Sequence, residues 1–210
     1  MGAQQLVRAR PAFTDGVLVA STLRLDPEMT GIATLGPPGT SSERAAEQLA
    51  ARLGRSACPV TLHGSYEEAA AAVLRGESAR LLVANAYHGV CAFYMDPRLT
   101  LELAFVQDTP KYGIAARARE PIPLTTRVAT HPAPEDLVAQ LLPSGYRVSA
   151  ITYARSTSAA AAQVTSGDAD LALTTEPAAT LYGLRFISAT RPIRMLWSVF
   201  VRRTNCEESM

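Results

Sequence analysis

A short apolar run that breaks at a glycine-rich turn and continues into an alanine-rich segment constrains this chain more than any other feature. The run Ile32–Leu35 ends at the turn Gly36–Gly39, and a helix is predicted to begin directly after it. In such a strand–loop–helix unit, free backbone N–H groups and the positive end of the helix dipole point to one spot, which favours an anion. Three hydroxyl side chains also stand there, namely Thr40, Ser41 and Ser42. Taken alone, the segment favours ordinary capping of a helix.

The chain after this turn alternates between strand-like and helix-like segments. Strands are predicted at Ile32–Leu35, Val60–His63, Arg80–Asn85, Leu99–Gln107, Gly113–Arg117, Arg127–Thr130, Tyr146–Thr152, Asp170–Thr174, Leu184–Ser188 and Leu196–Val201. Helices are predicted at Ser41–Leu53, Tyr66–Arg75, Ala133–Leu142, Thr157–Ser166 and Glu176–Tyr182. This alternation predicts an α/β fold with largely parallel sheets. Ligands of such sheets bind at the carboxyl ends of strands, where helices begin.

Composition excludes several classes of protein. The 210 residues are 48% hydrophobic, and 20 basic side chains nearly balance 19 acidic ones, so neither nucleic acid nor a membrane is an expected partner. The cysteines Cys58, Cys91 and Cys206 lack metal-ligand spacing and indicate a reduced compartment. The apolar stretch 16–22 is too short for a signal peptide, and no run reaches the ~18 residues of a membrane span. We expect a soluble, cytoplasmic protein.

Two later helix starts share the chemistry of the first. One contains Thr130 and His131 before a proline, and the other is a hydroxyl cluster formed by Ser156, Thr157 and Ser158. If two lobes face each other, these helix starts can converge on one cleft, which would suit a small molecule with two carboxylates. Each cluster taken singly is better explained by capping, but three clusters in one chain favour an anion site.

A search for familiar catalytic motifs finds none, and no metal site is expected. His63 ends a predicted strand and is interpreted as structural, whereas an orienting or capping role is favoured for His131. His88 lies in a loop directly after a strand, so it is a candidate pocket residue. From its residues alone, the chain is expected to be a two-lobed α/β protein that binds a small anion.

The order of the motifs resembles the catalytic domain of prephenate dehydratases over residues 32 to 203. The matching segments are Gly36–Ala45, Thr130–Pro132, Ser156–Ala161, Asp170–Leu173 and Tyr182–Leu184. The resemblance implies a two-lobed, periplasmic-binding-protein-like α/β fold with the active site between the lobes. It places one lobe at residues 30–108 plus 190–204 and the other at 109–189, after an N-terminal extension over residues 1–29. No C-terminal phenylalanine-sensing domain is expected.

Two departures from the dehydratase pattern imply a different reaction. The Thr-Arg-Phe triplet of dehydratases, whose Thr helps the ring hydroxyl leave and whose Arg holds substrate charge, reads Ser198-Val199-Phe200 here. The acid-containing segment of the family is replaced by residues 83–89, which hold no acid. These departures, with Phe93–Met95 and Asp108–Gly113, resemble the prephenate decarboxylases of antibiotic pathways, of the bacilysin and salinosporamide type.

That resemblance implies non-aromatising decarboxylation of prephenate to a dihydro-4-hydroxyphenylpyruvate, which would feed a non-proteinogenic amino acid in secondary metabolism. The implied catalytic residues are His88, Ser198 and Tyr87. The implied substrate-binding residues are Thr40, Ser41, Ser42, Asn85, Thr109, Tyr112, Thr130, His131, Ser156, Thr157, Ser158, Trp197, Val199 and Phe200. No metal or cofactor is implied, prephenate is the expected small-molecule partner, and a homodimer is expected. The alternatives are an aromatising prephenate dehydratase and a non-catalytic small-anion-binding protein of the same fold.

The exchange of arginine for Val199 allows two interpretations. A carboxylate placed against Val199, Trp197 and Phe200 would be poorly solvated, so its departure as carbon dioxide would relieve that cost. Alternatively, strand alternation turns Val199 into the sheet core. The proton donor for the ring stays open at this point, with His88, Tyr87, Tyr112, Ser198 and an ordered water as candidates.

Overall fold

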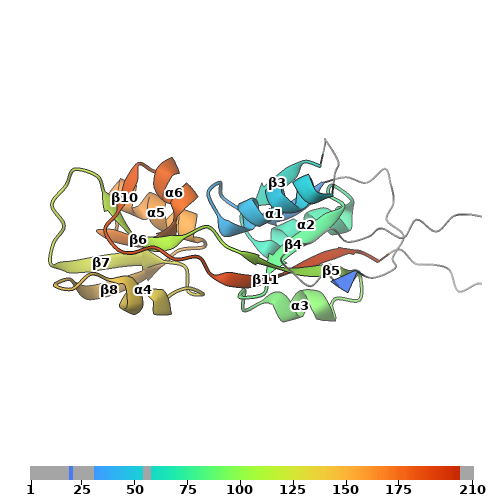
Figure 1. Cartoon of the computed structure of the whole chain (residues 1–210). Helices are drawn as coiled ribbons and strands as arrows, with labels where there is room; N and C mark the ends of the chain where they lie inside the picture. The colour runs from blue at the N-terminus through green and yellow to red at the C-terminus, as the bar shows by residue number, and fades with distance from the viewer. Residues whose placement is uncertain (1–18, 21–30, 54–57, 204–210) are drawn as a thin grey trace, which may run out of the picture.

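The computed structural model describes residues 19–20, 31–53 and 58–203. These residues form two mixed β-sheets, each with its own helices, which lie side by side in Figure 1. The predicted α/β class is confirmed. Apart from strand β1 (Val19–Ala20), the predicted N-terminal extension lies outside the described residues.

The first sheet contains six strands. Their order across the sheet is β1 (Val19–Ala20), β5 (Leu99–Asp108), β11 (Arg194–Arg202), β4 (Arg80–Ala84), β2 (Ile32–Leu35) and β3 (Val60–His63). Its helices are α1 (Ser41–Arg52), α2 (Tyr66–Arg75) and α3 (Val90–Met95). Helix α1 packs against one face of the sheet, and α2 and α3 pack against the other. We call this sheet and its helices the first lobe.

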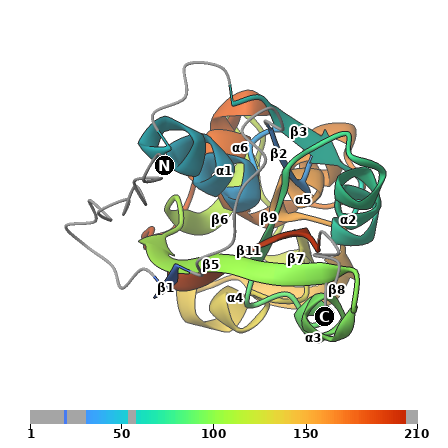
Figure 2. The same cartoon turned by 90° about the vertical axis from the view of Figure 1, so that its right-hand side faces the viewer.

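The second sheet contains five strands. Their order is β10 (Leu184–Phe186), β6 (Tyr112–Arg117), β9 (Leu171–Thr175), β7 (Thr125–Thr130) and β8 (Arg147–Tyr153). Its helices are α4 (Asp136–Leu141), α5 (Thr157–Ser166) and α6 (Glu176–Leu181). Figure 2, which looks along the molecule, shows this second lobe behind the first.

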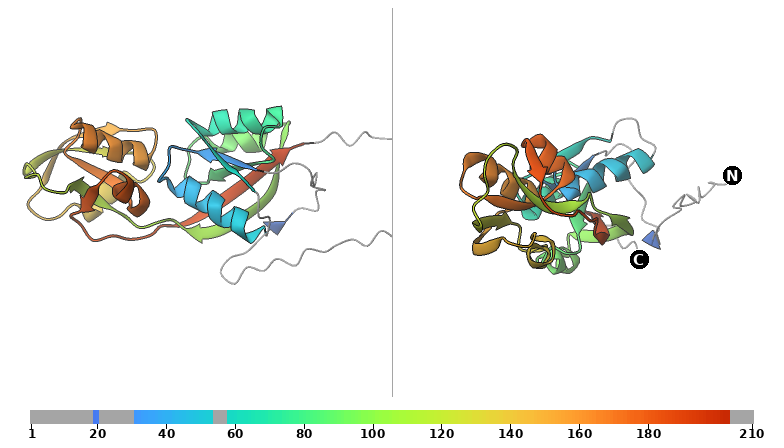
Figure 3. Two further views of the ribbon diagram at one scale, coloured as in Figure 1. Left: turned by 90° about the horizontal axis from the view of Figure 1, so that it is seen from above. Right: turned by 60° about the vertical axis from the view of Figure 1, so that its left-hand side comes forward.

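Two segments cross between the lobes. The chain passes from β5 to β6 through residues 109–111 and returns from β10 to β11 through residues 187–193, as the view from above in Figure 3 shows. The crossings are tied together, since the Thr109 N–H donates to the Ile193 carbonyl (2.9 Å) and the Ile193 N–H donates to Thr109 Oγ1 (3.0 Å). The N–H and the hydroxyl of Thr109 therefore hold the two crossing segments together.

The prediction of largely parallel sheets is wrong. In the described residues, β2 pairs in parallel with β3 and β4, and β7 pairs in parallel with β8 and β9. The other pairs are antiparallel: β1 with β5, β11 with β4 and β5, and β6 with β9 and β10. The crossings explain this, because β11 returns beside β5 in the opposite direction. No helix within the described part of the chain is long and apolar enough to cross a membrane.

Helices α1 and α5 begin where the sequence predicts. Thr40 accepts a hydrogen bond from the Glu43 N–H (3.1 Å), and Ser156 accepts one from the Ala159 N–H (3.0 Å), so each helix has a side-chain cap. Each helix buries its small side chains against its own sheet. Both helix starts therefore have fixed positions at the carboxyl ends of strands.

Candidate active site

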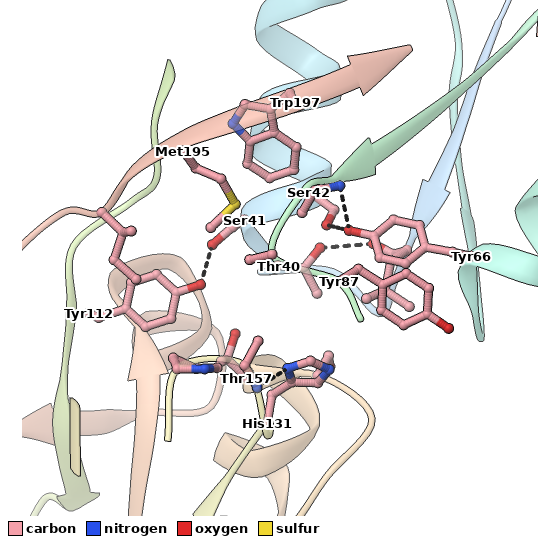
Figure 4. A pocket seen from close by; sticks show the side chains of 17 residues that line it. Thr40, Ser41, Ser42, Tyr66, Tyr87, Tyr112, His131, Thr157, Met195 and Trp197 are labelled. Atoms are coloured by element: carbon pink, nitrogen blue, oxygen red, sulfur yellow. Dashed lines mark hydrogen bonds between the residues drawn. The ribbon is translucent and has the colours of Figure 1, made fainter. Parts of the chain in front are cut away.

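A cavity of about 160 Å³ lies between the lobes. Its lining residues are Leu35, Thr40, Ser41, Ser42, Tyr66, Ala84, Ala86, Tyr87, Tyr112, His131, Ala133, Pro134, Ser156, Thr157, Ile193, Met195 and Trp197. Figure 4 shows residues of the first lobe facing Tyr112, His131 and Thr157 of the second. The prediction that the starts of α1 and α5 reach one cleft, one from each lobe, is confirmed.

The hydroxyl groups at the start of α1 are tied into the walls. Ser41 Oγ lies 2.8 Å from the Tyr112 hydroxyl, which comes from the second lobe. Ser42 Oγ lies 2.7 Å from the Tyr66 hydroxyl, and Thr40 Oγ1 donates to the Leu35 carbonyl (3.0 Å). A helix start leaves its first backbone N–H groups without intrahelical partners, and the start of α1 is the part of that helix that reaches the cavity.

Tight contacts hold the turn before α1 against the second lobe. Thr175 Oγ1 donates to the Gly39 carbonyl (2.8 Å), and Ser158 Oγ donates to the Pro38 carbonyl. Gly39 has a φ of +87°, and a Cβ there would lie 3.0 Å from the Ala178 Cα. Only glycine fits both the backbone conformation and the gap. Ser158 is fully buried in this contact and does not line the cavity, contrary to its predicted role.

Three tyrosines border the cavity as neutral hydrogen-bonding groups. Burial raises the pKa of Tyr66 to about 12 and also raises the pKa of Tyr112. Burial, together with the hydrogen bond that Tyr87 donates to Glu67 (2.6 Å), raises the pKa of Tyr87 to about 12. All three hydroxyls therefore keep their protons near neutral pH.

His131 is the lining residue whose side chain titrates nearest to neutral pH. Its Nδ1 accepts a hydrogen bond from the Ala133 N–H (3.1 Å), so the neutral ring carries its hydrogen on Nε2. Burial lowers the pKa of His131, and the nearby His88 lowers it further. His131 is thus a neutral donor rather than a cation.

We expect an NMR titration to give His131 a pKa below the ordinary value of 6.5. Because the pKa of His131 is lower in the folded state, the unfolded chain binds more protons than the folded chain at pH values between the two pKa values. The contribution of His131 to stability is therefore fully present above pH 6.5 and is lost as the pH falls through its folded-state pKa. His88→Gln removes a like charge and should raise the pKa of His131. A midpoint at or above 6.5 would contradict this description of the site.

The cavity has no charged wall. None of its lining residues is Asp, Glu, Lys or Arg, and the described residues hold no group of His, Cys, Asp and Glu suited to a metal ion. Its polar side chains carry hydroxyls and the neutral imidazole, and two helix starts reach it. An anion bound here is therefore held by hydrogen bonds and helix dipoles without an ion pair.

The structure does not bring the Ser198-Val199-Phe200 triplet to the cavity. Val199 and Phe200 are fully buried in the cores on opposite sides of the first sheet. On β11 the residues that line the cavity are Met195 and Trp197. The alternative that turns Val199 into the sheet core is the one observed: Val199 shares a face of β11 with Met195 and Trp197 but lies further along the strand, in the core that α1 covers.

Ser198 lies in a closed set of hydrogen bonds beneath the sheet. Its Oγ donates to Asn85 Oδ1 (2.7 Å) and lies 2.6 Å from the Tyr94 hydroxyl, while Asn85 Nδ2 donates to that hydroxyl (3.4 Å). This triad ties α3 and the loop after β4 to strand β11. The side chains of Ser198 and Asn85 are hydrogen-bonded to each other, and neither residue lines the cavity.

Ser198→Ala should destabilise the fold by about 0.5–1.5 kcal/mol, the net worth of a typical hydrogen bond, because Tyr94 is exposed and can exchange its lost partner for water. Urea unfolding measures the change, and Ser166→Ala, at an exposed serine, should stay within about 0.5 kcal/mol of wild type. Unchanged stability together with a hundredfold loss of turnover would instead support the predicted catalytic role.

Three other predicted residues also lie outside the lining: Thr109, which joins the two crossing segments, His88 and Thr130. His88 is exposed, with its ring 4.7 Å from that of Tyr87, and Thr130 is buried with its hydroxyl donating to the His131 carbonyl (3.1 Å). Tyr66 was not predicted, although it follows the strand β3 and the N-cap Ser65 just as Ser41 follows its own strand and cap. Met195 was not predicted either, although it shares a face of β11 with the predicted Trp197.

Fold and site together define a two-lobed α/β protein of the periplasmic-binding-protein-like type, with an uncharged, hydroxyl-rich cavity between its lobes. The family model for prephenate dehydratase matches residues 32–190. A curated prephenate decarboxylase of Planktothrix agardhii (strain NIVA-CYA 126/8) is 39% identical over 178 residues, covering 82% of this chain and 88% of the relative. One of Bacillus subtilis (strain 168) is 36% identical, covering 80% and 85%. The chain therefore belongs to the prephenate dehydratase family, among the members known as prephenate decarboxylases.

Solved structures support the fold assignment. The crystal structure of prephenate dehydratase from Arthrobacter aurescens in complex with L-Phe matches with a TM-score of 0.65 at 18% identity, covering 83% of this chain and 61% of that one. The prephenate dehydratase of Staphylococcus aureus matches with a TM-score of 0.54 at 12% identity, covering 84% and 68%. These likenesses confirm the predicted two-lobed fold.

Proposed function

We propose that this protein decarboxylates prephenate without aromatising it. The observation that carries the proposal is the uncharged cavity, which offers neither an acid to the substrate hydroxyl nor an arginine to its carboxylates. The family relationship supplies the substrate class, since curated relatives at 35–39% identity are prephenate decarboxylases.

Prephenate carries a carboxylate and a pyruvyl arm on one quaternary ring carbon, with a hydroxyl across the ring. In the proposed reaction, the bond from that carbon to its carboxylate breaks and carbon dioxide leaves. The electron pair forms a new ring double bond, the neighbouring double bond shifts, and a ring carbon beside the carbinol carbon takes one proton from solvent water. The hydroxyl stays, and the product is a dihydro-4-hydroxyphenylpyruvate.

The competing reaction is loss of hydroxide, which gives aromatic phenylpyruvate and is strongly downhill. Hydroxide leaves readily only when an acid protonates it. The raised pKa values of Tyr66 and Tyr87 and the neutral state of His131 make these groups weak acids. The cavity therefore favours decarboxylation by withholding acid catalysis from the hydroxyl.

We propose that the starts of α1 and α5 hold the substrate. Thr40, Ser41 and Ser42 would contribute from the first lobe, and Ser156 and Thr157 from the second. Four further lining residues complete the proposed contacts: Tyr87, Tyr112, His131 and Trp197. No cofactor is needed in this scheme, because bond cleavage and ring protonation require only positioning and a proton.

Residues 30–108 with 190–204 and residues 109–189 are proposed as two lobes that enclose the substrate. A cytoplasmic location, a homodimeric assembly and a place in an antibiotic pathway stay predictions.

The deciding experiment incubates purified protein with prephenate at pH 8 and follows the products by NMR, with a sample without protein as the control for spontaneous aromatisation. We expect carbon dioxide release and a product that retains the carbinol proton. Phenylpyruvate as the main enzymatic product would support the dehydratase alternative. Binding of prephenate without turnover would support the non-catalytic one.

A further inference from the structure

One wall of the cavity is apolar and comes from the end of β11 and the segment before it. Ile193, Met195 and Trp197 stand at alternate positions, so their side chains share one face. The Trp197 Nε1–H donates to the Gln107 carbonyl (3.3 Å), which leaves the carbon surface of the indole toward the cavity. In Figure 4, Met195 and Trp197 lie across the cavity from Thr157 and His131.

We infer that the carboxylate that leaves as carbon dioxide lies against Ile193, Met195 and Trp197, and that Met195 is a specificity-determining residue for cleavage of its bond. The inference rests on the proposed function.

The placement follows from what changes during the reaction. A hydrogen bond or ion pair to the leaving carboxylate is lost as its charge disperses, so such a contact raises the barrier. The carboxylate of the pyruvyl arm keeps its charge throughout, so its contacts leave the barrier unchanged. The donors at the start of α5 and on His131 therefore suit the pyruvyl arm, and the apolar wall suits the leaving group.

The same placement accounts for the driving force. A carboxylate against a thioether and an indole face has lost part of its hydration without gaining a partner. Cleavage converts this charged group into neutral carbon dioxide, while the electron pair enters the ring and a proton from solvent water is taken up there. The dianionic substrate thus becomes a monoanion, and the charge that disappears is the one at the apolar wall.

Met195 allows a direct test, because it is half-buried and a lysine of similar length can place its ammonium at the cavity. Met195→Lys should lower kcat on the order of 30-fold and lower KM for prephenate, since a charge-assisted contact stabilises the ground state. Met195→Gln should lower kcat by a smaller factor. Met195→Leu, which keeps the wall apolar, should stay within about threefold of wild type.

Phenylpyruvate serves as the probe for orientation, because it carries only the carboxylate of the pyruvyl arm. Calorimetric binding of phenylpyruvate should be equal in wild type and Met195→Lys within about threefold, whereas the KM for prephenate should fall in the lysine variant. Tighter binding of phenylpyruvate to the variant would place the pyruvyl arm at Met195 and overturn the inference.

Two further outcomes would also overturn it: full kcat in both polar variants, or an equal loss in Met195→Leu, which would mean that Met195 only fills space. If Met195→Lys does not fold, as judged by circular dichroism, the comparison of the glutamine and leucine variants decides. Failure of the proposed function is distinguishable, because then wild type itself releases no carbon dioxide from prephenate.

Discussion

Replacing Val199 by arginine should unfold the first lobe rather than convert the enzyme into a dehydratase. Val199 is fully buried beside Leu82 and Leu103, its pairing partners on either side, in the core that α1 covers. An unpaired guanidinium in this core should cost about 4 kcal/mol or more, a large part of the ~5–15 kcal/mol that stabilises a typical domain. We expect little soluble protein and an early urea transition.

Val199→Ile is the matched control, since it adds one methylene without charge and should cost less than about 2 kcal/mol. The double variant Ser198→Thr, Val199→Arg restores the dehydratase triplet and tests whether loss of this triplet changed the reaction. A folded double variant with a larger fraction of phenylpyruvate would show that these positions control the fate of the hydroxyl, in spite of their burial.

Gly39→Ala should nearly abolish turnover while leaving both lobes folded. The new Cβ would approach the backbone of Ala178 in the second lobe to 3.0 Å, and the φ of +87° is unfavourable for alanine. The turn must then move away from α6, which displaces the hydroxyl groups of α1 from those of α5. A displacement near 1 Å at a site of this kind costs on the order of a hundredfold in kcat/KM.

Gly145→Ala separates the effect of the positive φ from the effect of the contact with Ala178. Gly145 also has a positive φ, of +99°, but no atom lies within 4 Å of the added Cβ. It should lose about 1 kcal/mol of stability and keep its activity. Equal loss of activity in the two variants would show that the contact between Gly39 and Ala178 does not set the geometry of the cavity.

The sequence was informative wherever a local signal determines structure. The capping hydroxyls Thr40 and Ser156 mark the starts of α1 and α5, and both helices begin there because an N-cap depends on its own neighbours. Strand β5 and helix α2 were found from apolar runs and alanine content. Helix α3 was missed, since its six residues include β-prone valine, phenylalanine and tyrosine.

The site was predictable at its helix starts and not at strand β11. Hydroxyl clusters after strands predicted that the starts of α1 and α5 belong to one site, and the structure brings both helix starts to one cavity. On β11, a shift in register by one residue exchanges the two faces, and nothing local in the sequence distinguishes them. Ser198 and Phe200 were therefore given roles on the wrong face, whereas Val199 shares the face of Trp197 but lies further along the strand in the core, and Met195 was overlooked.

The position of β11 also determines the order in which the molecule can be completed during synthesis. Strand β11 lies between β5 and β4, which leave the ribosome roughly 95 and 115 residues earlier, and the whole second sheet is made in between. Until residues 194–202 emerge, the first sheet has an open slot with two unpaired strand edges, a template for pairing with the wrong chain. The second lobe can thus form during translation before the first sheet is complete. The wall that carries Met195 is then among the last parts of the enzyme to appear.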